Sequence, residues 1–311
     1  MEIAPLSELG SYVLRDLFSE EREAWSRSLN WDYREPQEII GAMIDARALP
    51  GFVALAEGMP VGYAFHVEER RTGLIGGCFV RKSQEGQGVE ERLLSQVVRT
   101  LKSSPKVRRI EAQFVSFRQW AIDEFFVRNR FIRYDRCFMR RSCAPAPAPK
   151  FSDSLVLRSW SLQDLEEAVA LTVDVYQTII DLQISCHYQS VESCREYLNS
   201  LIFRPGCGTF LPEASYGARD VATDELVGYV LASRISASGG HVPQIAVSKK
   251  HQGKGAGSGL LARVVRYLGL NGYQNVSLTV TERNHAAMSL YRSFGFSAHL
   301  RFPAFVWMSQ A

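Results

Sequence analysis

The chain has 311 residues, of which 46% are hydrophobic and 22% charged, and its formal net charge is +3. This composition fits a globular protein of two domains and excludes disordered and fibrous chains. The small charge without a clustered basic face argues against a nucleic-acid partner, and the absence of a signal peptide or a membrane-length apolar run predicts a cytoplasmic protein without a membrane partner.

A run of alternating Ala and Pro divides the chain near its middle. Residues 144–150 read Ala-Pro-Ala-Pro-Ala-Pro-Lys, a pattern that continues neither a helix nor a sheet ladder and favours an extended, semi-rigid linker. The sequence therefore predicts one domain over residues 1–143, a linker over 144–150 and a second domain over 151–311.

Strands and helices alternate in the second half. Ser161 and Asp164 offer a cap to the first helix, and an apolar, β-branched stretch over 226–233 is typical of a central strand. This order predicts an α/β (α+β) layered domain with a largely antiparallel sheet. The predicted strands are 155–158, 209–210, 214–220, 226–233, 241–247, 276–280 and 304–308, and the predicted helices are 165–177, 190–201, 257–270 and 286–294.

The first half repeats features of the second. Gly86 and Gly88 align with Gly253 and Gly255 at an offset of 167 residues, and residues 125–131 fall near 290–296 at an offset of 165. Each half also begins with a strand-like segment and a helix. A repeat of this length indicates a duplicated domain rather than a solenoid.

A glycine-rich loop joins the predicted strand 241–247 to the next helix. Gly253, Gly255 and Gly257 allow the backbone to approach a ligand, and the N–H groups at the helix N-terminus suit phosphate oxygens. The loop alone could also be a structural turn. Its spacing is not Gly-x-Gly-x-x-Gly, and Lys254 is followed by Gly255 rather than Ser or Thr, which disfavours dinucleotide and Walker-type sites.

Two blocks resemble the GNAT superfamily of N-acetyltransferases. Gln252-x-x-Gly255-x-Gly257 resembles the pyrophosphate signature Arg/Gln-x-x-Gly-x-Gly/Ala, and the block from Asn284 to Phe296 resembles the signature N-x-x-A-x-x-L-Y-x-x-x-G-F. The resemblance implies two tandem GNAT folds, each with a mixed, largely antiparallel sheet flanked by helices. It also implies an acyltransferase that uses acetyl-CoA as co-substrate.

The resemblance further assigns roles to individual positions. The strand before the loop would splay from its neighbour at a bulge, offer backbone groups to the pantetheine arm and direct one N–H at the thioester carbonyl. Asn284 would contact the arm from the other side, or cap the following helix, or do both. The implied cofactor-binding residues are Ile245, Ala246, Val247, Gln252, Gly253, Lys254, Gly255, Ala256, Gly257, Ser258, Asn284, Ala287 and Tyr291.

Tyr291 is the expected catalytic acid, because a neutral tyrosine can donate a proton to the leaving sulfur. It could instead be a packing residue of its helix. The amine must also lose a proton, and His241 is the first candidate base, followed by Glu282, with Glu213 and Asp220 further upstream. A water chain without a dedicated base is an alternative.

The first half departs from the pattern at the positions that would hold the cofactor. Glu85 stands in place of Gln252, Glu90 in place of Gly257 and Phe126 in place of Tyr291, and the position of Asn284 falls near Gln119. Carboxylates disfavour a pyrophosphate. The first half is therefore expected to bind acetyl-CoA poorly or not at all.

The acceptor is expected to be a primary amine of a small molecule or a peptide. It is not identified by the motifs, and the segments 180–188 and 203–216 are expected to meet it. The alternative is a non-catalytic acetyl-CoA-binding or interaction module. Six cysteines without a CxxC pair predict free thiols and no metal site, and the chain is expected to be a monomer or a homodimer.

Overall fold

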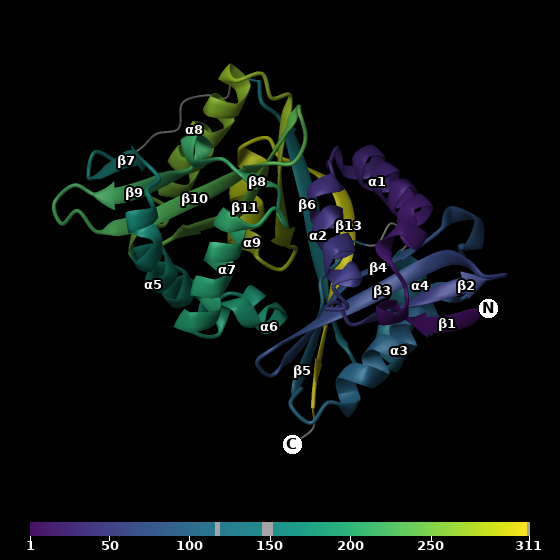
Figure 1. Cartoon of the computed structure of the whole chain (residues 1–311). Coiled ribbons are helices and arrows are strands. Elements are labelled where there is room, and N and C mark those ends of the chain that lie inside the picture. Colours follow the sequence, from purple (N-terminus) through teal and green to yellow (C-terminus); the bar gives the residue numbers. More distant parts are fainter. Residues whose placement is uncertain (116–118, 145–151, 310–311) are drawn as a thin grey trace. The chain divides into compact units, whose positions relative to one another are not determined.

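The computed structural model describes residues 1–115, 119–144 and 152–309. They form two compact units (Figure 1). The N-terminal unit comprises Met1–Asp135 with Phe302–Ala311, and the C-terminal unit comprises Arg136–Arg301. Each unit thus includes a segment from the other half of the sequence. Residues 145–150 of the expected linker lie outside the described residues, and the boundaries at 143 and 151 stay a prediction.

The N-terminal unit is built on a sheet of order β1-β2-β3-β4-β5-β13, in which only the β4–β5 pair is parallel. Its last strand is the end of β13, whose Phe305 pairs with Ala112. The strands are β1 (Glu2–Pro5), β2 (Gly51–Ala56), β3 (Met59–Glu69), β4 (Thr72–Val80), β5 (Arg109–Ala112) and β13 (Ser297–Met308), and the helices are α1 (Arg15–Leu29), α2 (Arg34–Asp45), α3 (Val89–Ser103) and α4 (Gln119–Arg128).

The C-terminal unit repeats this order as β7-β9-β10-β11-β12-β6, again with one parallel pair, β11–β12. A short strand, β8, pairs with the end of β10. The strands are β6 (Ile132–Ser142), β7 (Leu155–Ser159), β8 (Thr209–Phe210), β9 (Tyr216–Asp220), β10 (Leu226–Arg234), β11 (Gly239–Val247) and β12 (Asn275–Thr281), and the helices are α5 (Leu165–Tyr176), α6 (Asp181–Ile184), α7 (Val191–Phe203), α8 (Ala256–Leu270) and α9 (His285–Ser293).

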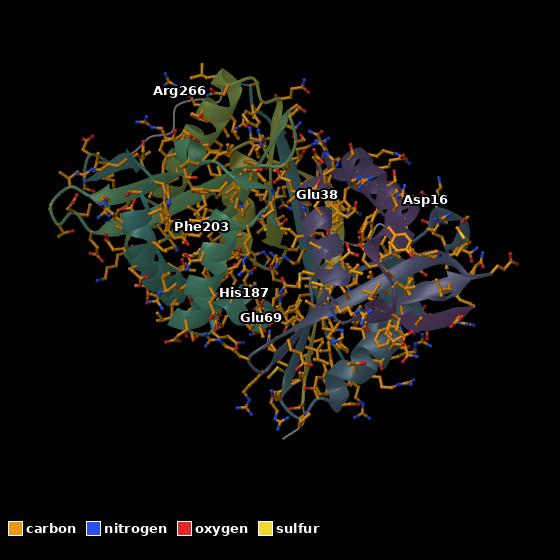
Figure 2. All side chains as sticks on the ribbon, viewed as in Figure 1. Asp16, Glu38, Glu69, His187, Phe203 and Arg266 are labelled. Atoms are coloured by element: carbon orange, nitrogen blue, oxygen red, sulfur yellow. The ribbon has the colours of Figure 1, made fainter. Side chains whose placement is uncertain are left out.

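Helices cover both faces of the sheet in the C-terminal unit (Figure 1). The α8 helix packs leucines and valines at helical spacing on one face, while Arg266 points outward from it (Figure 2). The α5 and α7 helices pack on the other face, against Tyr229 and Leu231 of β10. The predicted cap is confirmed, since Ser161 and Asp164 form a capping box before α5. The expected fold, a mixed and largely antiparallel sheet flanked by helices in each of two domains, is therefore confirmed.

The described residues contain no helix that is both long and apolar enough to cross a membrane.

Candidate active site

The strand β11 is bulged and leaves its neighbour β12 partway along its length. Leu231 of β10 pairs with Gln244 and Ser233 with His241, so that two residues of β11, Val242 and Pro243, lie opposite one residue of β10. Proline suits this position because it has no N–H to contribute to the ladder. The parallel pairing with β12 ends at Val242, and the last five residues of β11 therefore open away from β12.

The backbone of this open segment turns alternate N–H and C=O groups away from β10. The N–H of Ser248 donates to the carbonyl of Val227 at 2.8 Å. Residues of an antiparallel pair alternate between the two sides, so Ala246 also faces β10, whereas Ile245 and Val247 face the open side. In agreement, the carbonyl of Val247 accepts a bond from Gln252 Nε2 at 3.1 Å instead of from β10.

The glycine-rich loop turns directly into α8. Gly253 and Gly255 have φ of 76° and 86°, in the left-handed region that favours glycine. The first helical bond runs from Gly259 to Gly255, which leaves the N–H groups of residues 256–258 without helical acceptors. No acidic residue lies in this first turn, so the partial positive charge of the helix end is uncompensated.

These elements enclose a cavity of about 1030 Å³. It is slightly larger than the ~300–1,000 Å³ that is usual for small-molecule sites. Twelve of the thirteen residues predicted to bind the cofactor line it. The exception is Ala256, whose side chain is 1% exposed and packs in the core beneath α8. The predicted loop, strand and Tyr291 are thus brought together on one cavity.

Asn284 both caps α9 and lines the cavity, the two roles that the sequence left open. Its Oδ1 accepts a bond from the N–H of Ala287 at 3.2 Å, so it caps α9. It also lines the cavity. The cap fixes the orientation of the side chain at the cavity wall.

Tyr291 lies on the cavity face of α9. Its ring packs edge-on against Phe296, with centroids 6.1 Å apart, and 7% of the residue is exposed. Among the described residues its hydroxyl has no hydrogen-bond partner. Burial, with the nearby Tyr176 and Asp181, raises the pKa of Tyr291 above its usual range. Tyr291 therefore lines the cavity and carries a protonated hydroxyl with no partner among the described residues.

His241 does not line this cavity. It is 5% exposed within the sheet, where its Nδ1 lies 2.9 Å from Ser277 Oγ and its ring stacks on Phe138. Burial lowers the pKa of His241 to about 3. A buried histidine this weakly basic is a poor candidate base, so its pKa does not favour the predicted role.

The other predicted bases also lie off the cavity. Glu282 accepts a bond from Arg301 Nε at 2.7 Å and lines a second, smaller pocket with residues of α9. Glu213 is exposed. Asp220 accepts bonds from the N–H groups of two turn residues, 222 and 223, which lower its pKa. The structure does not bring any of these carboxylates to Tyr291.

The burial of His241 has a consequence for stability. A histidine whose folded pKa lies below its unfolded value of 6.5 opposes protonation, so the folded state loses stability as the pH falls below 6.5. With a folded pKa of about 3, the loss between pH 7 and pH 5 should be roughly 2 kcal/mol. Urea unfolding should show a smaller loss for His241→Gln than for the wild type. Replacement of the exposed His285 by Gln should leave the wild-type loss unchanged, and an equal loss in His241→Gln would contradict the assignment.

Sequence reasoning missed the part of the cavity wall at the end of α5. Val175, Tyr176, Thr178 and Ile179, at and after the end of α5, line the cavity. Tyr176 stacks on the buried Tyr188 with centroids 3.8 Å apart. These residues lie just before segment 180–188, which was expected to meet the acceptor, but no local motif marks them. The remaining missed lining residues are Ser152, Lys249, Ala286 and Leu290.

Gln244 ties this aromatic wall to the bulged strand. It is 3% exposed, donates from Nε2 to the Tyr176 hydroxyl at 3.3 Å and accepts from the Tyr188 hydroxyl at 3.4 Å. Burial raises the pKa of Tyr176 to about 12. The wall therefore carries neutral hydroxyl groups under ordinary conditions.

The equivalent loop of the N-terminal unit has the same backbone form but a different charge. Gly86 and Gly88 have φ of 75° and 73°, and α3 begins directly after them. Glu90, in its first turn, is 9% exposed, and burial with the charge of Glu90 raises the pKa of Cys78 on the preceding strand. Phe126, at the position of Tyr291, is fully buried against Phe305. The side chain of Gln119 lies outside the described residues.

No group of three or more His, Cys, Asp or Glu residues within the described ranges is arranged to hold a metal ion.

Known proteins resemble the chain in sequence and in fold. It is 25% identical over 177 residues to the uncharacterized N-acetyltransferase YobR of Bacillus subtilis (strain 168), and the match spans 57% of this chain but only 64% of that relative. A solved tandem GNAT protein from the clavulanic acid biosynthesis pathway has a TM-score of 0.68 at 15% identity, covering 100% of this chain and 99% of its own. A GCN5-related N-acetyltransferase from Sphaerobacter thermophilus has a TM-score of 0.63 at 18% identity, covering 84% and 80%.

The family assignment rests on two consecutive matches. The model of the acetyltransferase (GNAT) family matches residues 12–125 and again residues 176–296, which together make up most of the chain. The two matches fall on the two halves of the predicted duplication. The chain therefore belongs to the acetyltransferase (GNAT) family as a tandem GNAT protein.

Proposed function

We propose that the C-terminal unit transfers an acetyl group from acetyl-CoA to a primary amine, and that the N-terminal unit has no acetyl-CoA site. The observation that supports this most strongly is the cavity that joins the glycine-rich loop, the open segment of β11 and Tyr291. The equivalent loop of the N-terminal unit carries Glu90 instead of a glycine.

The residues of the cavity fit acetyl-CoA at three points. The free N–H groups at the start of α8, with Lys249 and Lys254 on the lining, suit the pyrophosphate. The backbone groups of Ile245 and the N–H of Val247 face the open side and suit the amide groups of the pantetheine arm, and one N–H there would stabilise negative charge on the thioester oxygen. The Tyr291 hydroxyl suits the sulfur.

The acceptor would approach from the wall formed by the end of α5. Val175, Tyr176 and Ile179 are uncharged at neutral pH. No Asp or Glu is found among the described residues that line the cavity. This wall suits a single amine on a small molecule or a peptide N-terminus better than a polycation. The amine would attack the thioester directly, and Tyr291 would donate its proton to the leaving sulfur.

Release of coenzyme A tests the proposal. A thiol reagent would follow the reaction of acetyl-CoA with a panel of amines: a peptide with a free N-terminus, lysine, glucosamine and spermidine. We expect at least one amine to release coenzyme A at a rate well above hydrolysis, with spermidine a poor acceptor. Binding of acetyl-CoA without turnover of any amine would favour the alternative, a non-catalytic acetyl-CoA-binding module.

A further inference from the structure

A buried carboxylate lies beside the acceptor wall of the C-terminal unit. Asp181 is the first residue of α6 and follows the lining residues Thr178 and Ile179 in the chain. It is 8% exposed. A carboxylate this deeply buried needs partners, because transferring an unpaired charge from water to the protein interior costs several kcal/mol of free energy.

Two partners hold the carboxylate in place. Thr281, fully buried at the end of β12, donates to Asp181 Oδ1 at 2.8 Å. Arg136 of β6 places Nη2 at 3.8 Å from the same oxygen. Both partners engage Oδ1, and the structure gives Oδ2 no hydrogen bond within the described residues. Asp181 therefore has a fixed position and one oxygen that can accept a further bond.

The charge of the Asp181 carboxylate influences the pKa of three nearby tyrosines. Its charge, after burial, helps to raise the pKa of Tyr176, Tyr188 and Tyr291. Tyr176 and Tyr291 both line the cavity. Asp181 thus contacts Thr281 of β12 and Arg136 of β6, and its charge reaches Tyr176 of α5, Tyr188 before α7 and Tyr291 of α9. The four bases expected from the sequence were His241, Glu282, Glu213 and Asp220. None of them is among the groups whose charge raises the pKa of Tyr291.

We propose that Asp181 takes up the proton of the acceptor amine through one bridging water, and so completes a proton circuit with Tyr291. This inference rests on the proposed function. Asp181 does not line the cavity itself, but unlike His241 or Glu282 it directly follows the lining residues Thr178 and Ile179 in the chain, and a single water could bridge it to the cavity.

The circuit balances. The nitrogen of the neutral amine forms a bond to the thioester carbon, and the carbon–sulfur bond breaks with its electron pair on sulfur. The amine proton passes through the water to Asp181, while the Tyr291 proton goes to the sulfur. Transfer of the proton from Asp181 to the Tyr291 oxygen, through the same water, restores both groups for the next cycle.

Two variants of Asp181 and one control test the circuit. Asp181→Asn keeps the shape of the side chain, Asp181→Ala opens a space for a small carboxylic acid, and Asp174→Asn removes an exposed carboxylate from α5. Each is compared with the wild type in acetyl-CoA affinity by calorimetry, in Tm, and in kcat for the fastest amine of the panel with and without added formate.

We expect Asp181→Asn to lower kcat about 100-fold while the acetyl-CoA Kd stays within twofold, and Asp174→Asn to match the wild type. Formate should raise the kcat of Asp181→Ala in proportion to its concentration and leave the wild type unchanged, an effect that a merely structural role does not produce. Wild-type kcat in Asp181→Asn, or a loss in Asp181→Ala that formate does not reverse, would overturn the circuit. A wild-type chain that releases no coenzyme A would instead overturn the proposed function.

Discussion

Replacement of Gly257 by Glu should abolish acetyl-CoA binding by the whole chain. Gly257 lies in the first turn of α8 and lines the cavity, where the free N–H groups create a positive potential. A carboxylate there would repel the pyrophosphate and occupy the N–H groups that should bind it. In the N-terminal unit Glu90 occupies the same place after a loop of the same form. By calorimetric titration we expect one acetyl-CoA per wild-type chain, and a Kd raised at least ~100-fold in Gly257→Glu, or about 3 kcal/mol.

Gly257→Gln separates charge from size in this test. A Cβ at position 257 would meet Leu290 Cδ2 at 3.1 Å, so any side chain there requires a small shift of that leucine. The Gln variant shares this steric cost and lacks the charge, and its Kd should rise by roughly a factor of ten or less. Equal Kd values for the Gln and Glu variants would refute the electrostatic argument. Two equivalents bound by the wild type would show that the N-terminal unit also binds.

The loop and its cavity could be predicted because their signals are local. Gly253 and Gly255 need positive φ, and a strand and an amphipathic helix flank them within a few residues. The second block on α9 supplied Asn284 and Tyr291 at a spacing that places both near one face. Ala256 was the one predicted contact whose side chain turned into the core, because it lies on the side of α8 that packs against the sheet.

The acceptor wall could not be predicted because it depends on contacts between distant residues. Asp181 and Thr281 are 100 residues apart, and Gln244 reaches Tyr176 across 68 residues. Neither pair has a spacing that a sequence pattern could reveal. His241 was preferred as a base for its ordinary pKa, but burial in the sheet, which only the structure shows, lowers that pKa to about 3.

The sequence predicted the last strand but not the strand with which it pairs. The sequence predicted a closing strand over 304–308, and β13 contains it. Its partner in the N-terminal unit is β5, where Met308 pairs with Arg109 and Phe305 with Ala112. Alternation along a strand predicts which side chains face the core, but it carries no information on which of several similar strands lies alongside.

Replacement of Tyr291 by Phe should lower kcat about 100-fold or more and leave the acetyl-CoA Kd nearly unchanged. The substitution removes the hydroxyl, which has no partner among the described residues, and keeps the ring that packs on Phe296. General acid catalysis typically contributes ~10²–10⁴-fold. Because the pKa of Tyr291 is raised, the wild type should also keep its proton donor up to at least about pH 10. Steady-state rates of coenzyme A release between pH 7 and pH 10 would measure both effects.

Tyr216→Phe is the matched control for this experiment. Tyr216 lies on β9, away from the cavity lining, and its hydroxyl donates to the carbonyl of Glu213 at 3.1 Å. Loss of that single exposed bond should cost roughly 1 kcal/mol of stability or less, and kcat should stay at the wild-type value. If Tyr291→Phe also kept the wild-type kcat, the sulfur would not depend on this hydroxyl. Tyr291 would then be a wall residue, and the proton for the thiolate would have to come from solvent.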